Sequence, residues 1–279
     1  TFKAIRAGDR SADTLNAGRK ILDNAADAQK AWWKMGADSP YFKRWNEGSV
    51  MNYNQTGLRD PSKPPPLTKA EGDTPVVLYH GTEPYRSSSG GNIISFKPSR
   101  TGTGGPGVYL TPDPDLASSY GASGSVYPVY ANLKKPLVTN KLPADSDLAK
   151  IADDLEAYAK TIGDDPGYRQ QLTEAASRYR DKKYLLERMK HQQDVGGMGF
   201  YSVMEEIPAY NHVRRELIPK HYDGIILHNP HPGVTTPEVI IFDPKQIKSK
   251  FNKGTFDKNN PDITASLAGA FDDPTVMRG

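Results

Sequence analysis

Four side chains of this sequence that could take part in chemistry lie beside short apolar runs. His80 follows the run VVLY, Tyr109 lies within GVYLT, Tyr120 follows eleven residues later, and Glu238 opens the run EVII. Imidazole and carboxylate groups donate or accept protons, and phenol rings stack on flat ligands. Taken singly, each residue type is more often structural than functional at such a position. A shared function for these residues therefore requires a fold that brings the four together.

Short strands and one short helix would have to position these residues. Apolar runs of strand length indicate strands at 76–79, 93–96, 108–111, 126–133, 224–227 and 239–242. Proline and aspartate turns indicate the start of a helix over 113–120. Between 99 and 107 four glycines and one proline indicate a loop.

Helical patterns lie before this set of strands and within it. Apolar spacing predicts helices at 11–36, 148–162 and 167–193, with a further one within 206–219. Two adjacent tryptophans, Trp32 and Trp33, predict that the first helix packs against another part of the chain. We expect an N-terminal helical segment at 1–50, an extended Pro/Gly-rich connector at 51–75, one domain at 76–250 with a helical insert at 144–221, and an irregular tail at 251–279.

Composition limits the possible functions. The 279 residues carry a net charge of +3, too small to indicate a nucleic-acid binder, and they contain no cysteine. Disulfides, thiolate metal sites and a cysteine nucleophile are therefore excluded. No apolar run reaches the roughly 20 residues of a membrane span. The chain begins with Thr1 and reads as a piece of a longer polypeptide that acts in a cytoplasm, with injection or secretion as open routes.

The ordered motifs HGT, GVYLT, the tyrosine at +11 and PEVIIFD together resemble the His–Tyr–Glu class of ADP-ribosyltransferases, which includes diphtheria toxin and the poly(ADP-ribose) polymerases. The resemblance covers about 76–247 with the insert set aside. The flanking stretches YFKRWNEGS and GTFDKNNPDI are similar to those of ADP-ribosyltransferase domains in multidomain phage and prophage proteins. The resemblance implies an α+β fold with a split, mostly antiparallel β-sheet.

The resemblance also implies NAD as a substrate and a role for each motif residue. Glu238 would bond the ribose 2′-hydroxyl and stabilise the positive charge of an oxocarbenium-like transition state. His80 would donate to a ribose hydroxyl, and Tyr109 and Tyr120 would enclose the nicotinamide ring. Gly81 would let the backbone approach the nicotinamide amide.

Three further residues are candidates for the adenosine and phosphate end of NAD. These residues are Thr82, Ser99 and Arg100. An arginine beside a glycine-rich loop can reach an anion.

The function predicted in this way is NAD-dependent mono-ADP-ribosylation of a host macromolecule, a protein in preference to a nucleic acid. A nucleic-acid acceptor stays open and predicts arginine and lysine from the insert along the NAD cleft. NAD hydrolysis without an acceptor also stays open. From a different class comes a non-enzymatic phage module that binds NAD or serves as a structural part.

Other sites are weaker predictions. The arginine-directed class of ADP-ribosyltransferases needs an acidic residue or glutamine two positions before the catalytic glutamate, where this chain has Thr236. His228 and His231 lack a third metal ligand in view, so we expect no metal. The basic run 178–190 is interpreted as a solvated helix face.

Overall fold

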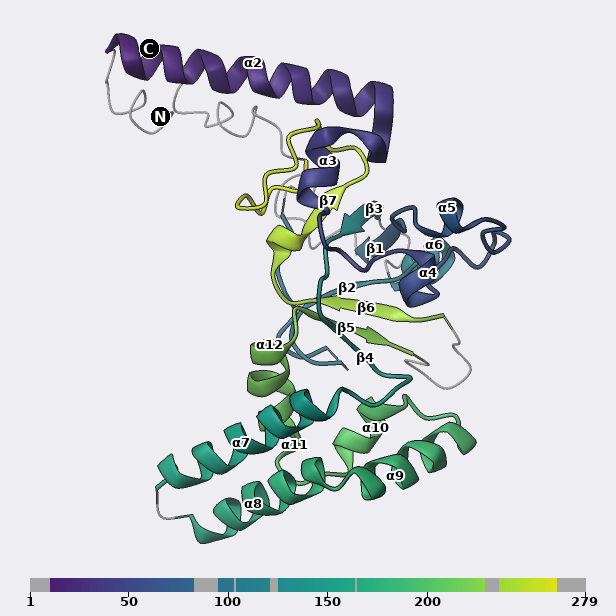
Figure 1. Cartoon of the computed structure of the whole chain (residues 1–279), viewed down its shortest axis with the longest axis vertical. Helices are drawn as coiled ribbons and strands as arrows, with labels where there is room; N and C mark the ends of the chain where they lie inside the picture. The colour runs from purple at the N-terminus through teal and green to yellow at the C-terminus, as the bar shows by residue number, and fades with distance from the viewer. Residues whose placement is uncertain are drawn as a thin grey trace.

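The computed structural model describes residues 11–82, 95–102, 104–120, 125–163, 165–228 and 236–264. Its strands lie between two helical parts, with the long helix α2 (Ala12–Met35) at one end and the helices of the insert at the other (Figure 1). This arrangement confirms the mixed fold of helices and strands that the sequence predicts.

Two separate sheets form the centre of the molecule. The first has the order β1-β3-β7, with β1 (Leu78–Thr82), β3 (Ser125–Ala131) and β7 (Ile247–Ser249), all antiparallel. The second has the order β2-β6-β5-β4, with β2 (Val108–Leu110), β6 (Glu238–Ile241), β5 (Gly224–Leu227) and β4 (Pro136–Val138). Only β4 and β5 run parallel among these pairs. The expected split, mostly antiparallel sheet is therefore confirmed.

One pair of backbone hydrogen bonds joins the two sheets. The N–H of Tyr79 donates to the carbonyl of Thr111 at 2.7 Å, and the N–H of Thr111 donates back at 3.0 Å. This bridge sets the residue after Tyr79, which is His80, beside the strand that carries Tyr109.

The second sheet is buried on both faces, which explains its continuous apolar runs GIIL and EVII. Successive side chains of a strand point to opposite faces. Ile225 and Ile240 accordingly pack into the helical insert, whereas Ile226 and Val239 pack into the core shared with the first sheet. The insert thus packs against the face of the sheet that carries Ile240 and Glu238.

The insert contains more helices than the sequence predicts. They are α7 (Asp145–Thr161), α8 (Pro166–Arg180), α9 (Lys182–Asp194), α10 (Phe200–Glu205), α11 (Tyr210–His212), the π-helix η2 (Val213–Leu217) and α12 (Ile218–His221). The single helix expected at 167–193 is wrong, because Asp181 leaves the helical conformation and caps both neighbours. Its carboxylate accepts the N–H of Tyr184 at 2.9 Å, which starts α9.

The strand predictions also need correction. Of the strand expected at 93–96, only Ser95 and Phe96 are described, and neither belongs to a strand. The three-residue strands β4 and β7 were not predicted. The helix α6 (Pro114–Tyr120) lies where the sequence indicates it.

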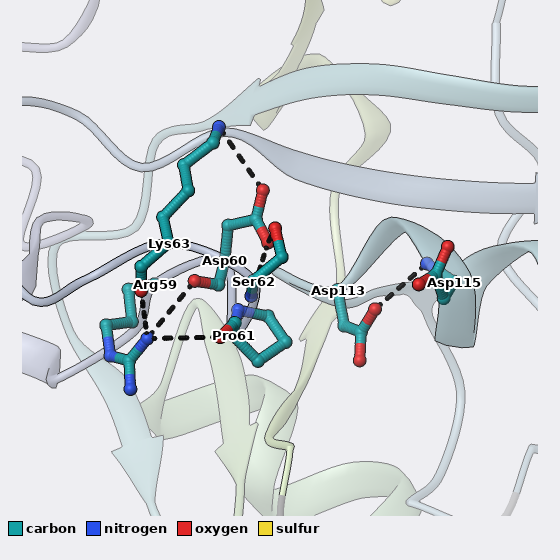
Figure 2. A network of polar contacts seen from close by, with 7 residues as sticks. All are labelled: Arg59, Asp60, Pro61, Ser62, Lys63, Asp113 and Asp115. Atoms are coloured by element: carbon teal, nitrogen blue, oxygen red, sulfur yellow. Dashed lines mark hydrogen bonds and ion pairs between the residues drawn. The ribbon is translucent and has the colours of Figure 1, made fainter.

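The segment 51–75 is not extended throughout, since it holds the short helices α4 (Tyr53–Thr56) and α5 (Lys69–Gly72). Met51 and Leu58 are buried in the same core as β1. Between the two helices Arg59 donates to the carbonyls of Asp60 and Pro61, and Lys63 pairs with the Asp60 carboxylate at 3.2 Å (Figure 2). The domain boundaries themselves stay a prediction.

The two N-terminal tryptophans have different environments. Trp32 is buried in an aromatic cluster with Phe42, Trp45, Tyr130 and Phe256, whereas Trp33 is 74% exposed. The expected packing therefore holds for one of the two. Phe256 belongs to the stretch 252–264, in which no helix or strand occurs. This stretch and α3 (Pro40–Trp45) anchor the end of α2.

None of the helices in the described residues is both long enough and apolar enough to cross a membrane.

Candidate functional site

His80 lies on β1 beside the backbone of Tyr109. Its Nδ1 is 2.8 Å from the carbonyl oxygen of Tyr109. Because a carbonyl can only accept, Nδ1 must carry the proton, and Nε2 of the neutral ring is then an acceptor. Burial lowers the pKa of His80 despite this hydrogen bond, which favours the neutral ring. Neutral His80 would therefore accept from a ribose hydroxyl, where the sequence argument expected it to donate.

The helix α6 brings Tyr120 to Glu238. The carboxylate of Asp113 caps this helix by accepting the N–H groups of Asp115 and Leu116 at 2.9 and 3.2 Å (Figure 2 shows the first). At the other end of α6, the Tyr120 hydroxyl donates to Oε1 of Glu238 at 2.9 Å. Glu238 is only 5% exposed, whereas Tyr120 is 47% exposed. The second and third motifs are therefore in direct contact.

Tyr109 reaches the site from the neighbouring strand. Tyr109 is paired with Ile240, so the alternation of side chains places Tyr109, Ile240 and Glu238 on one face of the sheet. The Tyr109 hydroxyl donates to the carbonyl of Gly105 at 2.7 Å. Burial and the nearby Tyr201 raise the pKa of Tyr109, so its phenol is neutral at physiological pH. Burial and the hydrogen bond to Glu238 likewise raise the pKa of Tyr120.

Five of the predicted residues line one small cavity of about 60 Å³. Its lining consists of Tyr79, His80, Gly81, Tyr109, Leu110, Thr111, Ala117, Tyr120 and Glu238. Hydrogen-bonding groups and aromatic carbon therefore converge on one small cavity.

Three predicted residues lie outside this cavity lining. Thr82 ends β1 opposite Ser125. The backbone of Ser99 pairs with Gly107 at the base of the glycine-rich loop, and Arg100 is exposed. Their assignment to the adenosine and phosphate end stays a prediction.

Basic residues of the insert pair with acids of the insert itself. Arg180 contacts Asp153 and Glu156, and Arg188 contacts Glu206. Among the described residues, no lysine or arginine lines the 60 Å³ cavity. Arg100 and the insert's Arg214 lie at the glycine-rich loop beside it, so a nucleic-acid acceptor stays an open prediction.

Of the two histidines considered as metal ligands, His228 lies within the described residues. His228 is half-buried, its backbone N–H donates to Thr139, and burial lowers its pKa. His231 lies outside the described residues. Within the described ranges, no group of three metal-binding side chains occurs.

A larger cavity, of about 790 Å³, lies elsewhere. Arg44, Lys134, Asp223 and Gln246 are among its lining residues. Asp223 precedes β5 and Gln246 follows β6, so this cavity lies at the opposite end of the sheet from Glu238. It contains none of the predicted site residues, and we do not place the chemistry there.

Several residues near the site were missed by the sequence argument. Phe96 packs edge-to-face on His80 with 4.7 Å between ring centroids. Thr111 supplies the bridge to β1, and Arg214 of the insert lies against the glycine-rich loop. The apolar and glycine patterns of the sequence mark these stretches but do not reveal which residues they contact.

Comparison with known families agrees with the motifs. The family described as ADP-ribosyltransferase in polyvalent proteins matches residues 70–256, about two thirds of the chain. No curated protein and no solved structure matches the chain.

Proposed function

Because this chain belongs to the family of ADP-ribosyltransferases in polyvalent proteins, we propose that it cleaves NAD and transfers a single ADP-ribose to a protein. The observation that carries the proposal is the convergence of His80, Gly81, Tyr109, Tyr120 and Glu238 on one cavity. These residues come from three strands and a helix, and their motifs are up to 158 positions apart in the sequence.

The proposed reaction breaks the bond between the nicotinamide nitrogen and the ribose carbon. Nicotinamide leaves with the bonding electron pair, and positive charge develops on the ribose as it does in glycoside cleavage. The Glu238 carboxylate stabilises this charge, and being 5% exposed it acts with little competition from water. The acceptor then bonds to the ribose carbon and loses its proton.

The other residues would orient the dinucleotide. His80 accepts from a ribose hydroxyl through Nε2, and the backbone at Gly81 binds the nicotinamide amide. Tyr120 lines the cavity of about 60 Å³ and bonds Glu238 there. Tyr120 is the side chain best placed to turn, because it ends α6 and is 47% exposed. NAD binding would then replace or share the Tyr120–Glu238 hydrogen bond.

A protein acceptor is favoured over a nucleic acid. The phosphates of a nucleic acid would need unpaired arginine or lysine near the cleft. In the described residues the cavity lining contains neither type, and the insert's Arg180 and Arg188 are paired with acids. NAD hydrolysis remains the alternative in which water takes the place of the acceptor.

Labelled NAD distinguishes these functions. The purified chain and its Glu238→Gln variant are incubated with a lysate, and the products are treated separately with protease and nuclease. Glutamine keeps an acceptor for Tyr120 but loses the charge, so the variant should transfer label at least about 100-fold more slowly. Label that only protease removes supports the proposal. Label that nuclease removes identifies a nucleic-acid acceptor, free ADP-ribose identifies hydrolysis, and intact, unbound NAD in every lysate contradicts the enzyme assignment.

A further inference from the structure

The glycine-rich loop 99–107 covers the ring of Tyr109. The loop is closed at its base by backbone hydrogen bonds of 2.8 and 3.0 Å between Ser99 and Gly107. At Gly102 an added Cβ would lie 2.2 Å from the Tyr109 hydroxyl oxygen. At Gly105 the backbone carbonyl accepts the hydrogen bond from that hydroxyl. Glycine is therefore required here for close approach to a tyrosine.

The same loop rests on β6, next to the catalytic glutamate. An added Cβ would lie 2.1 Å from Cδ1 of Ile240 at Gly104, and 2.5 Å from Cγ2 of Ile240 at Gly107. Ile240 is two residues from Glu238, on the same face of the strand. The position of the loop is thus set by contacts within the site.

A residue of the helical insert lies on the outer side of this loop. Gly105 has a φ of +105°, and an added Cβ would lie 3.1 Å from Cγ and 3.5 Å from Cδ of Arg214. The aliphatic stem of Arg214 therefore packs beside the residue whose carbonyl holds Tyr109. Arg214 belongs to the π-helix Val213–Leu217, a local widening of the helix that often occurs at functional sites.

The guanidinium end of Arg214 is held within the insert. It lies 5.1 Å from the centroid of the Tyr210 ring. Burial lowers the pKa of Arg214, but contacts with Tyr201 and Tyr210 outweigh burial and raise it. The Tyr210 hydroxyl in turn donates to that of the fully buried Tyr201 at 2.6 Å. Arg214 is thus fixed to the core of the insert while its stem contacts the loop.

We propose that the helical insert positions Tyr109 for the reaction, with Arg214 as the positioning residue. Arg214 holds the backbone at Gly105, and the carbonyl of Gly105 holds the Tyr109 phenol. The inference rests on the proposed function, in which Tyr109 packs on nicotinamide. The insert is then a part of the catalytic domain that sets the geometry of its NAD cleft.

The test compares substitutions at two adjacent arginines of the π-helix. Arg214→Ala removes the stem and the charge, Arg214→Met keeps most of the stem, and Arg215→Ala changes the exposed neighbour as a control. We expect Arg214→Ala to raise the KM for NAD about tenfold and Arg214→Met to raise it less. Arg215→Ala should leave the KM unchanged. Melting temperatures show whether each variant is folded, and Arg214→Met serves if Arg214→Ala is not.

A double variant separates positioning from a merely structural role. Tyr109→Phe removes the hydroxyl through which Arg214 would act, so adding Arg214→Ala to it should raise the KM little further. If the rise in KM of the double variant equals the product of the two single rises, the substitutions act independently and the inference is overturned. Equal KM values for Arg214→Ala and Arg215→Ala would overturn it too.

A fluorotyrosine placed at position 109 gives a readout that needs no NAD. Its ¹⁹F resonance should shift in Arg214→Ala and in Arg214→Met, and stay in place in Arg215→Ala. An inactive wild type with this pattern contradicts the proposed function but supports the contact through Gly105. An unshifted resonance in folded Arg214→Ala contradicts the contact itself, whatever the activity.

Discussion

Tyr120 and Glu238, 118 positions apart in the sequence, share a hydrogen bond of 2.9 Å. The bond joins the last residue of α6 to the first residue of β6. Oε1 of the carboxylate, the group proposed to stabilise the transition state, is therefore occupied by a phenol before NAD arrives. The partly exposed tyrosine is the member of the pair that can move.

Substitutions at Tyr120 should separate its ring from its hydroxyl. Tyr120→Phe keeps the aromatic face and loses the donor, so we expect the KM for NAD to stay within about twofold and the free energy of unfolding to fall by about 1 kcal/mol. Tyr120→Ala also loses the stacking surface, and the KM should rise about tenfold or more. Steady-state kinetics and urea unfolding measure both effects. Similar KM values for the two variants would contradict a stacking role.

The pKa of His80 gives a stability change with a defined sign. Because burial lowers this pKa below 6.5 in the folded chain, the unfolded chain binds more protons as pH falls below that value. The contribution of His80 is fully present above pH 6.5 and is lost as pH falls through its folded pKa. Between pH 7.5 and pH 5 the free energy of unfolding should therefore fall more for the wild type than for His80→Gln. A difference that stays constant over this range would show that His80 is not held neutral.

The kcat/KM for NAD should depend on the same protonation of His80. The neutral ring with a proton on Nδ1 accepts from ribose, whereas the protonated ring has no acceptor. We expect kcat/KM to be level from about pH 7 to pH 9 and to fall in acid. A rise in kcat/KM below pH 6 would instead assign a donating, protonated His80.

The sequence predicted those features that depend on one short stretch. The apolar run that ends at His80, the strand that carries Tyr109 and the helix that ends at Tyr120 all follow from local patterns. The overall fold of helices and split sheets followed from the family resemblance. The roles of the site residues stay predictions, although five of them share a cavity.

Features that depend on contacts between distant stretches, or on one residue within a uniform pattern, were not predictable in this way. The Nδ1 of His80 faces the carbonyl of Tyr109, a contact between two strands, and for this reason we propose that Nε2 accepts, where the sequence predicted a donor. Asp181 ends one helix and starts the next within a charged run of uniform helical pattern. Trp33 is exposed although its neighbour Trp32 is buried, because adjacent helical residues point in different directions.

The buried Lys248 gives a pH-dependent test in the alkaline range. Its ammonium donates to the carbonyls of Asn260 and Asp262, which fastens the C-terminal stretch to β7. Burial lowers the pKa of Lys248 to about 8, although Asp257 and Asp262 partly oppose this effect. The unfolded chain therefore binds more protons between pH 8 and pH 10.5, and folding stability rises with pH in that window.

Comparison with Lys248→Met isolates this contribution. Between pH 8 and pH 10 the free energy of unfolding of the wild type should gain about 2 kcal/mol relative to the variant. Urea unfolding at the two pH values measures the gain. A constant difference between the two proteins would mean that Lys248 keeps its ordinary pKa when buried.

The glycine-rich loop gives the last prediction, through Gly102. A methyl group there would lie 2.2 Å from the Tyr109 hydroxyl oxygen and 2.3 Å from Cζ of the ring, so either the loop or the ring must move. Gly102→Ala should lower the free energy of unfolding by about 1 to 3 kcal/mol. It should also raise the KM for NAD, because Tyr109 is displaced from the cleft.

Gly163→Ala is the matched control, since an added Cβ there meets no atom within 4 Å. That variant loses only unfolded-state freedom, so its stability should stay the same or rise by up to about 1 kcal/mol, with an unchanged KM. Thermal unfolding and NAD kinetics on the two variants decide the matter. Equal stability and equal KM in Gly102→Ala and Gly163→Ala would show that the loop can shift without moving Tyr109. The glycines of this loop would then not set the geometry of the site.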